Sequence, residues 1–238
     1  MNFLSLESTT VSQSSAPAPE RSTTFAAVSM PVKPLSGEDQ ARADLYALLA
    51  RLFLAPPDAA LLDALSTSEP ILAQGGELAL EQAWERLTMA SSVMDPQSVQ
   101  DEFDALFIGI GTPLLNPYGS RYIAGFINDT PLAELRADLA RLGLARVQGT
   151  GEFEDHIGAL CETMRVLVGG APGVKPQPVE QQRYFFEVHI APWYERAMND
   201  IAGADGANYY RLVARLGAAF LDIEADAFAV EEQSNETA

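Results

Sequence analysis

The stretch Val99–Tyr122, VQDEFDALFIGIGTPLLNPYGSRY, changes character in its middle. Asp95 and Pro96 precede it as a helix cap followed by proline at the first helical position, and apolar residues then recur at helical spacing. From Gly109 the composition turns to Gly, Pro, Asn and Ser, although apolar side chains continue to Tyr122. The sequence therefore predicts an amphipathic helix that leads into an apolar loop.

This loop is apolar where an ordinary connection would be polar. Its apolar residues are Ile110, Leu114, Leu115, Tyr118 and Tyr122. A loop that only joins two helices can be short and hydrophilic. We therefore expect the segment either to rest on the core or to remain available for the apolar surface of a partner.

Helical signals occur on both sides of this stretch. Ser36 and Asp39 form a capping-box pattern before an apolar helical repeat that the prolines at 56 and 57 end. Further helical repeats begin near residues 58, 75, 130, 153, 184 and 208, and the sequence has no alternating strand pattern bounded by hairpin turns. These patterns predict an all-α fold, a single-domain bundle of roughly ten helices over residues 38–224.

The two ends of the chain differ from this region. Residues 1–37 are rich in Ser, Thr, Ala and Pro without a sustained apolar period, which predicts a disordered segment. No run of seven or more apolar residues follows a basic start, so we expect no secretory signal. Residues 225–238 are acidic and are expected to form a flexible tail. No stretch approaches the ~20 apolar residues of a membrane span, and we expect a cytoplasmic protein.

Composition narrows the class of function. The chain has 238 residues, 47% of them hydrophobic, and a formal net charge of −18. It can therefore bury a full core, while its charge repels nucleic acid and anionic lipid and favours basic partners or simple solubility. The single cysteine, Cys161, excludes a disulfide framework and a cysteine-based metal site, and its place in an apolar stripe predicts a buried thiol.

The residues that catalysis usually needs are scarce. His156 and His189 are the only histidines, and without an HExxH pattern they cannot build the usual zinc site unless carboxylates take part. No Walker-type loop occurs, and no GxGxxG lies between a strand and a helix. A triad of Ser120, His156 and Asp155 lacks a nucleophile elbow. We predict no catalytic residue, no metal site and no cofactor.

An acidic run, Glu152–His156, stands at the head of the helix expected over residues 153–168. Helical spacing places His156 at the border of the apolar stripe and Asp155 farther round on the polar side. Carboxylates in the first turn stabilise a helix through their interaction with its dipole, and this ordinary role is one explanation of the cluster. A binding role at the rim of the helix is the other.

Three motifs follow one another along the chain. The first is an acid and an aromatic residue, Leu-Phe, a glycine-containing loop and Pro-aromatic-Gly-Ser. The second is a short acidic run that ends in Asp-His, and the third is an aromatic helix that leads to His and then Pro-Trp. They read Glu102-Phe103, Leu106-Phe107, Gly109, Pro117-Tyr118-Gly119-Ser120 and Tyr122; Glu152-Phe153-Glu154-Asp155-His156; and Tyr184-Phe185-Phe186, His189 and Pro192-Trp193. Together they resemble the TorD/DmsD/NarJ family of redox-enzyme maturation chaperones, although Phe153 stands where that family commonly has proline.

The resemblance implies a cytoplasmic chaperone, not an enzyme, that holds the twin-arginine signal peptide of a molybdenum-cofactor oxidoreductase until the cofactor is inserted. It implies an apolar groove with an acidic rim, contact with the client's signal peptide and folded body, and a monomer or domain-swapped dimer. The residues that it marks as peptide-binding are Phe103, Phe107, Leu114, Leu115, Pro117, Tyr118, Gly119, Ser120, Tyr122, Asp155 and His156. The alternatives are a helical adaptor or scaffold without a peptide groove, and a small-molecule enzyme that uses His156 with its neighbouring carboxylates.

Overall fold

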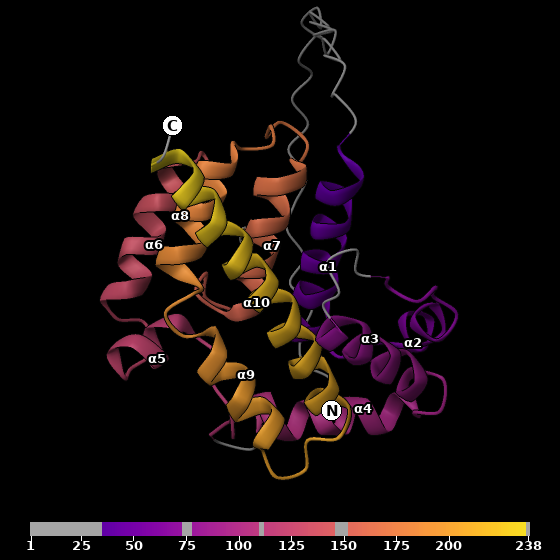
Figure 1. Ribbon diagram of the computed structural model, residues 1–238. Coiled ribbons are helices and arrows are strands. Elements are labelled where there is room, and N and C mark those ends of the chain that lie inside the picture. The colour runs from indigo at the N-terminus through magenta and orange to yellow at the C-terminus, as the bar shows by residue number, and fades with distance from the viewer. Residues whose placement is uncertain (1–34, 73–77, 110–111, 146–151, 237–238) are drawn as a thin grey trace, which may run out of the picture. The chain divides into compact units, whose positions relative to one another are not determined.

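The structure is a computed structural model that describes residues 35–72, 78–109, 112–145 and 152–236 (Figure 1). These residues form ten α-helices and one π-helical turn without a named strand, which confirms the all-α prediction. The elements are α1 (Gly37–Leu54), α2 (Ala59–Ser66), α3 (Leu78–Ser91), α4 (Pro96–Phe103), η1 (Asp104–Ile108), α5 (Gly119–Ala124), α6 (Thr130–Arg141), α7 (Ile157–Gly169), α8 (Val179–His189), α9 (Tyr194–Gly203) and α10 (Tyr209–Glu236). None of the described helices is long and apolar enough to span a bilayer.

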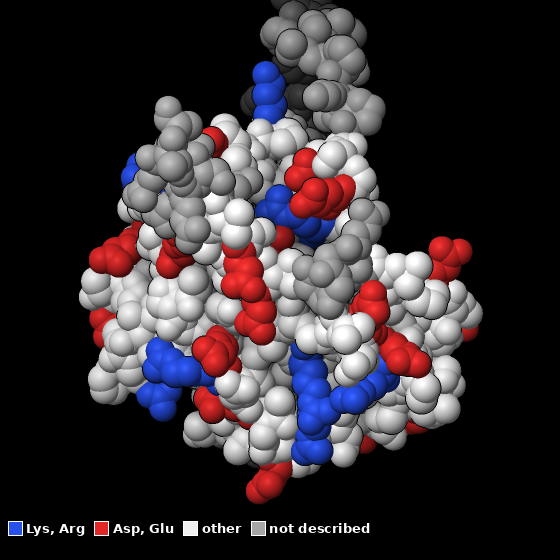
Figure 2. Space-filling model, in the orientation of Figure 1, with Lys and Arg blue, Asp and Glu red and all other residues white. Residues whose placement is uncertain are grey.

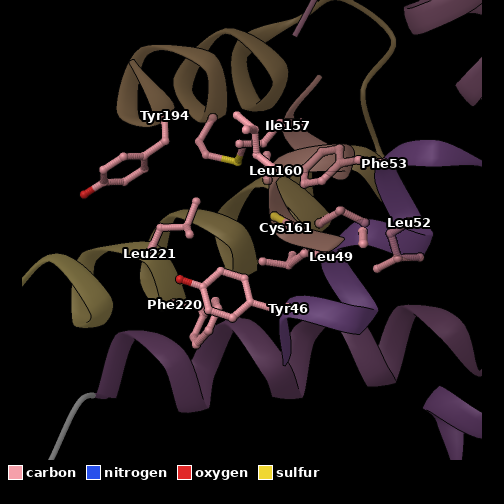
Figure 3. Close-up of a cluster of buried hydrophobic side chains, with 14 of the residues drawn as sticks. Tyr46, Leu49, Leu52, Phe53, Ile157, Leu160, Cys161, Tyr194, Phe220 and Leu221 are labelled. Atoms are coloured by element: carbon pink, nitrogen blue, oxygen red, sulfur yellow. The ribbon is translucent and has the colours of Figure 1, made fainter. Parts of the chain in front are cut away.

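The centre of the bundle is built from α1, α7 and α10. α1 packs along α7, while α10 runs beside α9 and α3 (Figure 1). Tyr46 of α1, Cys161 of α7 and Phe220 of α10 lie in one buried cluster (Figure 3), with the Tyr46 and Phe220 rings 4.7 Å apart, edge to face. Burying large apolar side chains from three helices is the main term that stabilises such a core.

The helix starts follow the capping residues expected from the sequence. The side chains of Ser36, Asp58 and Asp95 each accept a hydrogen bond from a backbone N–H in the first turn of the helix that follows, at 2.8–3.0 Å. These bonds satisfy N–H groups that have no partner inside the helix. The predicted beginnings of α1, α2 and α4 are therefore confirmed.

The apolar loop is shorter than predicted. α4 continues into η1, which ends at Gly109 with φ +62°, and Gly119 already begins α5. The prediction of a loop reaching Tyr122 was therefore wrong for its last four residues, and Ile110 lies outside the described residues. The N–H groups of Gly119 and Ser120 at the start of α5 donate to the carbonyl and the carboxylate of Asp155, which lies far away along the chain, so no local pattern announces this start.

The acidic run lies before α7 and not in its first turn. α7 begins at Ile157, and His156 is its N-cap residue. His156 is only 4% exposed and Asp155 only 3%, so the prediction that they lie at a rim and on a polar face was wrong. Helical geometry does not apply to residues that precede the helix, and these two are covered by residues 117–120 instead.

The last helix passes the expected end of the domain. α10 continues beyond Glu224 to Glu236, with Phe228 buried against Phe186 at 5.4 Å between ring centroids. Glu224 is itself buried and accepts hydrogen bonds from Arg42 at 2.7 and 2.8 Å and from the Tyr46 hydroxyl at 2.9 Å. These contacts tie α10 to α1. The segment 1–34 lies outside the described residues.

Candidate functional site

Two of the sequence motifs are joined by backbone hydrogen bonds. Tyr118 and His156 form an isolated antiparallel bridge, in which the Gly119 N–H donates to the Asp155 carbonyl and the Ile157 N–H to the Pro117 carbonyl, both at 2.9 Å. The segment before α5 therefore lies along the segment before α7. This pairing brings two stretches more than 30 residues apart in the sequence into one site.

Asp155 is the buried acid of this site. Its Oδ2 accepts a hydrogen bond from the Ser120 N–H at 2.8 Å, at the start of α5, and the Ser120 hydroxyl accepts one from the Asn128 N–H at 3.1 Å. Its Oδ1 is buried without a hydrogen-bond partner among the described residues. Because burying an unpaired polar atom is unfavourable, this oxygen lacks a hydrogen bond that a buried carboxylate usually makes.

His156 acts as a cap and not as a titrating group at the rim. Its Nδ1 accepts a hydrogen bond from the Gly158 N–H at 3.1 Å, and the Tyr118 ring lies edge to face at 5.0 Å. Burial lowers the pKa of His156 to about 4, although Glu152 and Asp155 act in the opposite direction. The imidazole is therefore neutral near pH 7 and its Nδ1 is occupied, which does not fit the alternative of an enzyme that uses His156 as acid and base.

The third motif packs against the first around α5. The Trp193 indole N–H donates to the His189 carbonyl at 2.7 Å. A Cβ on Gly119 would lie only 3.2 Å from Trp193 Nε1, so glycine lets the backbone approach the indole. The Tyr122 ring stacks on Trp193 at 5.3 Å, and its hydroxyl donates to Asp200 at 2.9 Å. All three motifs therefore meet at α5.

The predicted site residues face three different hollows. A pocket of about 160 Å³ lies beneath α5 and contains Gly119 and Asp155. Leu114 and Leu115 line an open hollow of about 340 Å³ against α9. The Tyr118 hydroxyl donates to Glu152. Glu152 lines a hollow of about 550 Å³ along α7. Among the described residues, these side chains therefore line separate hollows.

The first half of the first motif holds the bundle together. The Glu102 carboxylate accepts hydrogen bonds from the N–H groups of Asn208, Tyr209 and Tyr210 at 2.7–3.1 Å, which caps α10. The Phe103 and Phe107 rings both pack on Tyr210, at 5.5 and 5.2 Å. Phe103 is buried and Phe107 half-buried, so these two predicted peptide-binding residues position α10.

Several side chains that line the pocket around Asp155 belong to none of the three sequence motifs. Glu134 of α6 and Ile123 of α5 line the pocket with Val188 and His189 of α8. Phe126, in the turn after α5, is 72% exposed. A signal was present, because GFIND at 125–129 carries two large apolar residues inside a turn where polar residues are usual.

Among the described residues, the side chains of this site are suited to binding a ligand and not to catalysing a reaction. Within them, no group of three His, Cys, Asp or Glu side chains is placed to hold a metal ion. Cys161 is fully buried, and burial raises the pKa of its thiol, so the nucleophilic thiolate does not form. What this site presents is a carboxylate oxygen without a partner beside apolar side chains, an arrangement that suits a cationic and apolar ligand.

Comparison with known proteins agrees with the motifs. The sequence model of the nitrate reductase delta subunit family matches residues 74–199, more than half of the chain, and this region contains all three motifs. No curated protein is significantly similar to the chain. Chaperones of this family are cytoplasmic and not catalytic, and membership implies binding of a molybdoenzyme precursor. The chain therefore belongs to the nitrate reductase delta subunit family, within the TorD/DmsD/NarJ group of redox-enzyme maturation chaperones.

Proposed function

We propose that this protein binds the twin-arginine signal peptide of a molybdenum-cofactor oxidoreductase and holds it until the cofactor has been inserted. The observation that carries the proposal is the buried Asp155 carboxylate, whose Oδ1 has no partner among the described residues, at the point where the three motifs meet. An arginine guanidinium offers the N–H donors that such an oxygen lacks.

The charge of the protein supports a cationic ligand. The formal net charge is −18, and Figure 2 shows acidic side chains spread over the face drawn, with Lys and Arg confined to a few groups. A surface of this kind speeds the approach of a basic peptide and orients it. An exposed ion pair adds only about 0–1 kcal/mol, so charge alone does not account for tight binding.

Apolar contacts supply the larger part of the affinity. Leu114 is 58% exposed and Ile108 52% exposed, close to the start of the apolar loop. Burying ~400 Å² of apolar peptide surface at ~25 cal/mol/Å² gives a gross ~10 kcal/mol before the cost of ordering the peptide. A signal peptide, with an apolar stretch next to its arginines, combines the two kinds of contact.

The arrangement around α5 also supports a preformed site. The backbone pairing of 117–119 with 155–157, the stacking of Tyr122 on Trp193 and the bond from Tyr122 to Asp200 all hold α5 in place. A ligand that meets a rigid site loses less free energy to ordering of the protein. A helical adaptor without a peptide site is the alternative, because Glu102 and His156 of the same motifs make internal bonds.

Titration calorimetry with a synthetic signal peptide tests the proposal. We expect the wild-type protein to bind an Arg-Arg peptide and to bind the matched Lys-Lys peptide more weakly, because a planar guanidinium engages a carboxylate at two points. A double-substitution cycle between Asp155→Asn and the peptide arginines measures the coupling. Absence of binding to any client signal peptide would favour the adaptor.

A further inference from the structure

The pocket beneath α5 has the size of a site for one side chain. Its walls come from α5, from the first half of α6 and from the end of α8 together with Pro192. The volume, about 160 Å³, is well below the roughly 300 Å³ at which small-molecule sites begin. A pocket this small suits the end of an extended side chain better than a free metabolite or a folded segment.

The charges around the pocket are negative. Asp155 lines the pocket, with its Oδ1 buried and without a partner among the described residues, and Glu134 lies on the α6 wall. No Lys or Arg is among the described residues that line the pocket. Arg136, the nearby cation, is held by Glu154 at 2.9 and 3.1 Å. The pocket therefore offers two carboxylates to a cation that comes from outside.

His189 adds no positive charge of its own. Burial lowers its pKa to about 4, with the Glu134 carboxylate acting in the opposite direction and Arg141 acting with burial. Its Nε2 lies 2.8 Å from Asp138 Oδ2, which orients the ring. Glu134 and His189 both line the pocket, and Glu134 itself is exposed. A neutral His189 therefore adds no positive charge to the pocket near pH 7.

An apolar surface continues from the mouth of this pocket. Ile123 and Val188 line the pocket and are also 46% and 38% exposed. Phe126 and Ile127, 72% and 38% exposed, lie in the turn that follows α5, and the bond from the Asn128 N–H to the Ser120 hydroxyl holds that turn against α5. Neighbouring exposed apolar side chains often mark an interaction surface, whereas single exposed apolar residues are common on any protein.

We infer that one arginine of the client peptide lies in this pocket between Asp155 and Glu134, with the peptide's neighbouring apolar residues on Ile123, Phe126 and Ile127. This inference rests on the proposed function and adds to it the residues that select arginine and a second apolar surface besides that of Ile108 and Leu114. Ile123 belongs to both surfaces, so a peptide with an arginine beside apolar residues reaches both within a few residues of extended chain, at about 3.3 Å each.

Glu134→Gln tests the charged half. It removes one carboxylate from an exposed position, so we expect an unchanged melting temperature and a loss of about five- to tenfold in affinity for an Arg-Arg peptide. The preference for Arg-Arg over Lys-Lys should also shrink. Glu85→Gln is the matched control, because Glu85 is exposed on α3 and the change removes the same charge away from the pocket. This control should retain wild-type affinity and preference.

Phe126→Ser tests the apolar half, with Val93→Ser as control because Val93 is 79% exposed in the turn before α4. We expect Phe126→Ser to lower the affinity for the Arg-Arg peptide about tenfold, at low and at high salt, and Val93→Ser to leave it unchanged. If the wild-type protein binds the Arg-Arg peptide but both variants behave like their controls, the inference is wrong while the proposed function stands. If the wild-type protein binds no signal peptide, the proposed function fails first.

Discussion

The Asp155 carboxylate accepts the Ser120 backbone N–H at 2.8 Å, so one oxygen of this buried acid stabilises the start of α5 while the other stays unpartnered among the described residues. One side chain therefore has a structural contact and a group left over for binding. Substitution can separate the two roles, because the amide of an Asp155→Asn variant keeps an acceptor oxygen for the Ser120 N–H but loses the negative charge.

Asp155→Asn should leave the melting temperature unchanged or raise it, because the bond to Ser120 is kept and an unpaired buried charge is removed. Affinity for an Arg-Arg peptide should fall at the same time. Asp155→Ala loses the bond as well and should cost about 1 kcal/mol of stability. Thermal melts and calorimetry on both variants provide the check, and an Asn variant that melts early with full affinity would assign Asp155 to structure alone.

The lowered pKa of His156 implies that the free energy of unfolding decreases as the pH falls. Its pKa is about 4 in the folded protein and about 6.5 in the unfolded chain, so the unfolded state takes up the proton first as pH falls. The stabilising contribution is complete above about pH 6.5 and is lost towards pH 4, at about 1.4 kcal/mol per unit of pKa difference. His189, also lowered to about 4, acts in the same direction.

His156→Asn should reduce this acid sensitivity while it keeps the cap, because asparagine is a favoured N-cap residue. We expect denaturant unfolding at pH 7 to change by less than about 1 kcal/mol and the fall between pH 7 and 5 to become shallower. An unaltered pH profile would show that the acid sensitivity arises from other groups.

Glu102 provides a test of a motif residue with a purely structural role. Its carboxylate receives three backbone N–H groups at the start of α10, and Glu102→Ala leaves them without that acceptor. We expect a loss of about 1–3 kcal/mol in unfolding free energy, with peptide affinity retained below the melting transition. A variant that remains stable but no longer binds would contradict this assignment.

The apolar loop yields a prediction about salt. Replacing Leu114, Leu115 or Tyr118 by serine should steeply lower the affinity for the client peptide. The wild-type affinity should depend only weakly on salt, because salt screens exposed charges and does not screen apolar burial. Leu114→Ser is the cleanest of these, since Leu114 is 58% exposed and its replacement removes little buried surface from the fold. Calorimetry at low and high salt measures both effects. Binding that disappears with salt and ignores Leu114 would mean that charge carries the interaction.

The sequence alone determined the all-helical class and the starts of α1, α2 and α4. Ser36, Asp58 and Asp95 cap helices within their own neighbourhood, and the apolar periods behind them need no distant partner to be recognised. The order of the three motifs likewise identified the family, because each motif is a short local pattern. Local chemistry was sufficient for both.

Only the tertiary structure decided what the motif residues do. Asp155 and His156 look like the first turn of a helix, yet residues 117–120 bury them; Glu102 looks like a surface acid, yet it caps α10. The pocket beneath α5 needs Glu134 and Val188 from helices whose own periods contain no sign of it. Burial and hydrogen-bond partners are set by residues far away along the chain, and helical periodicity carries information only about neighbours within a few turns.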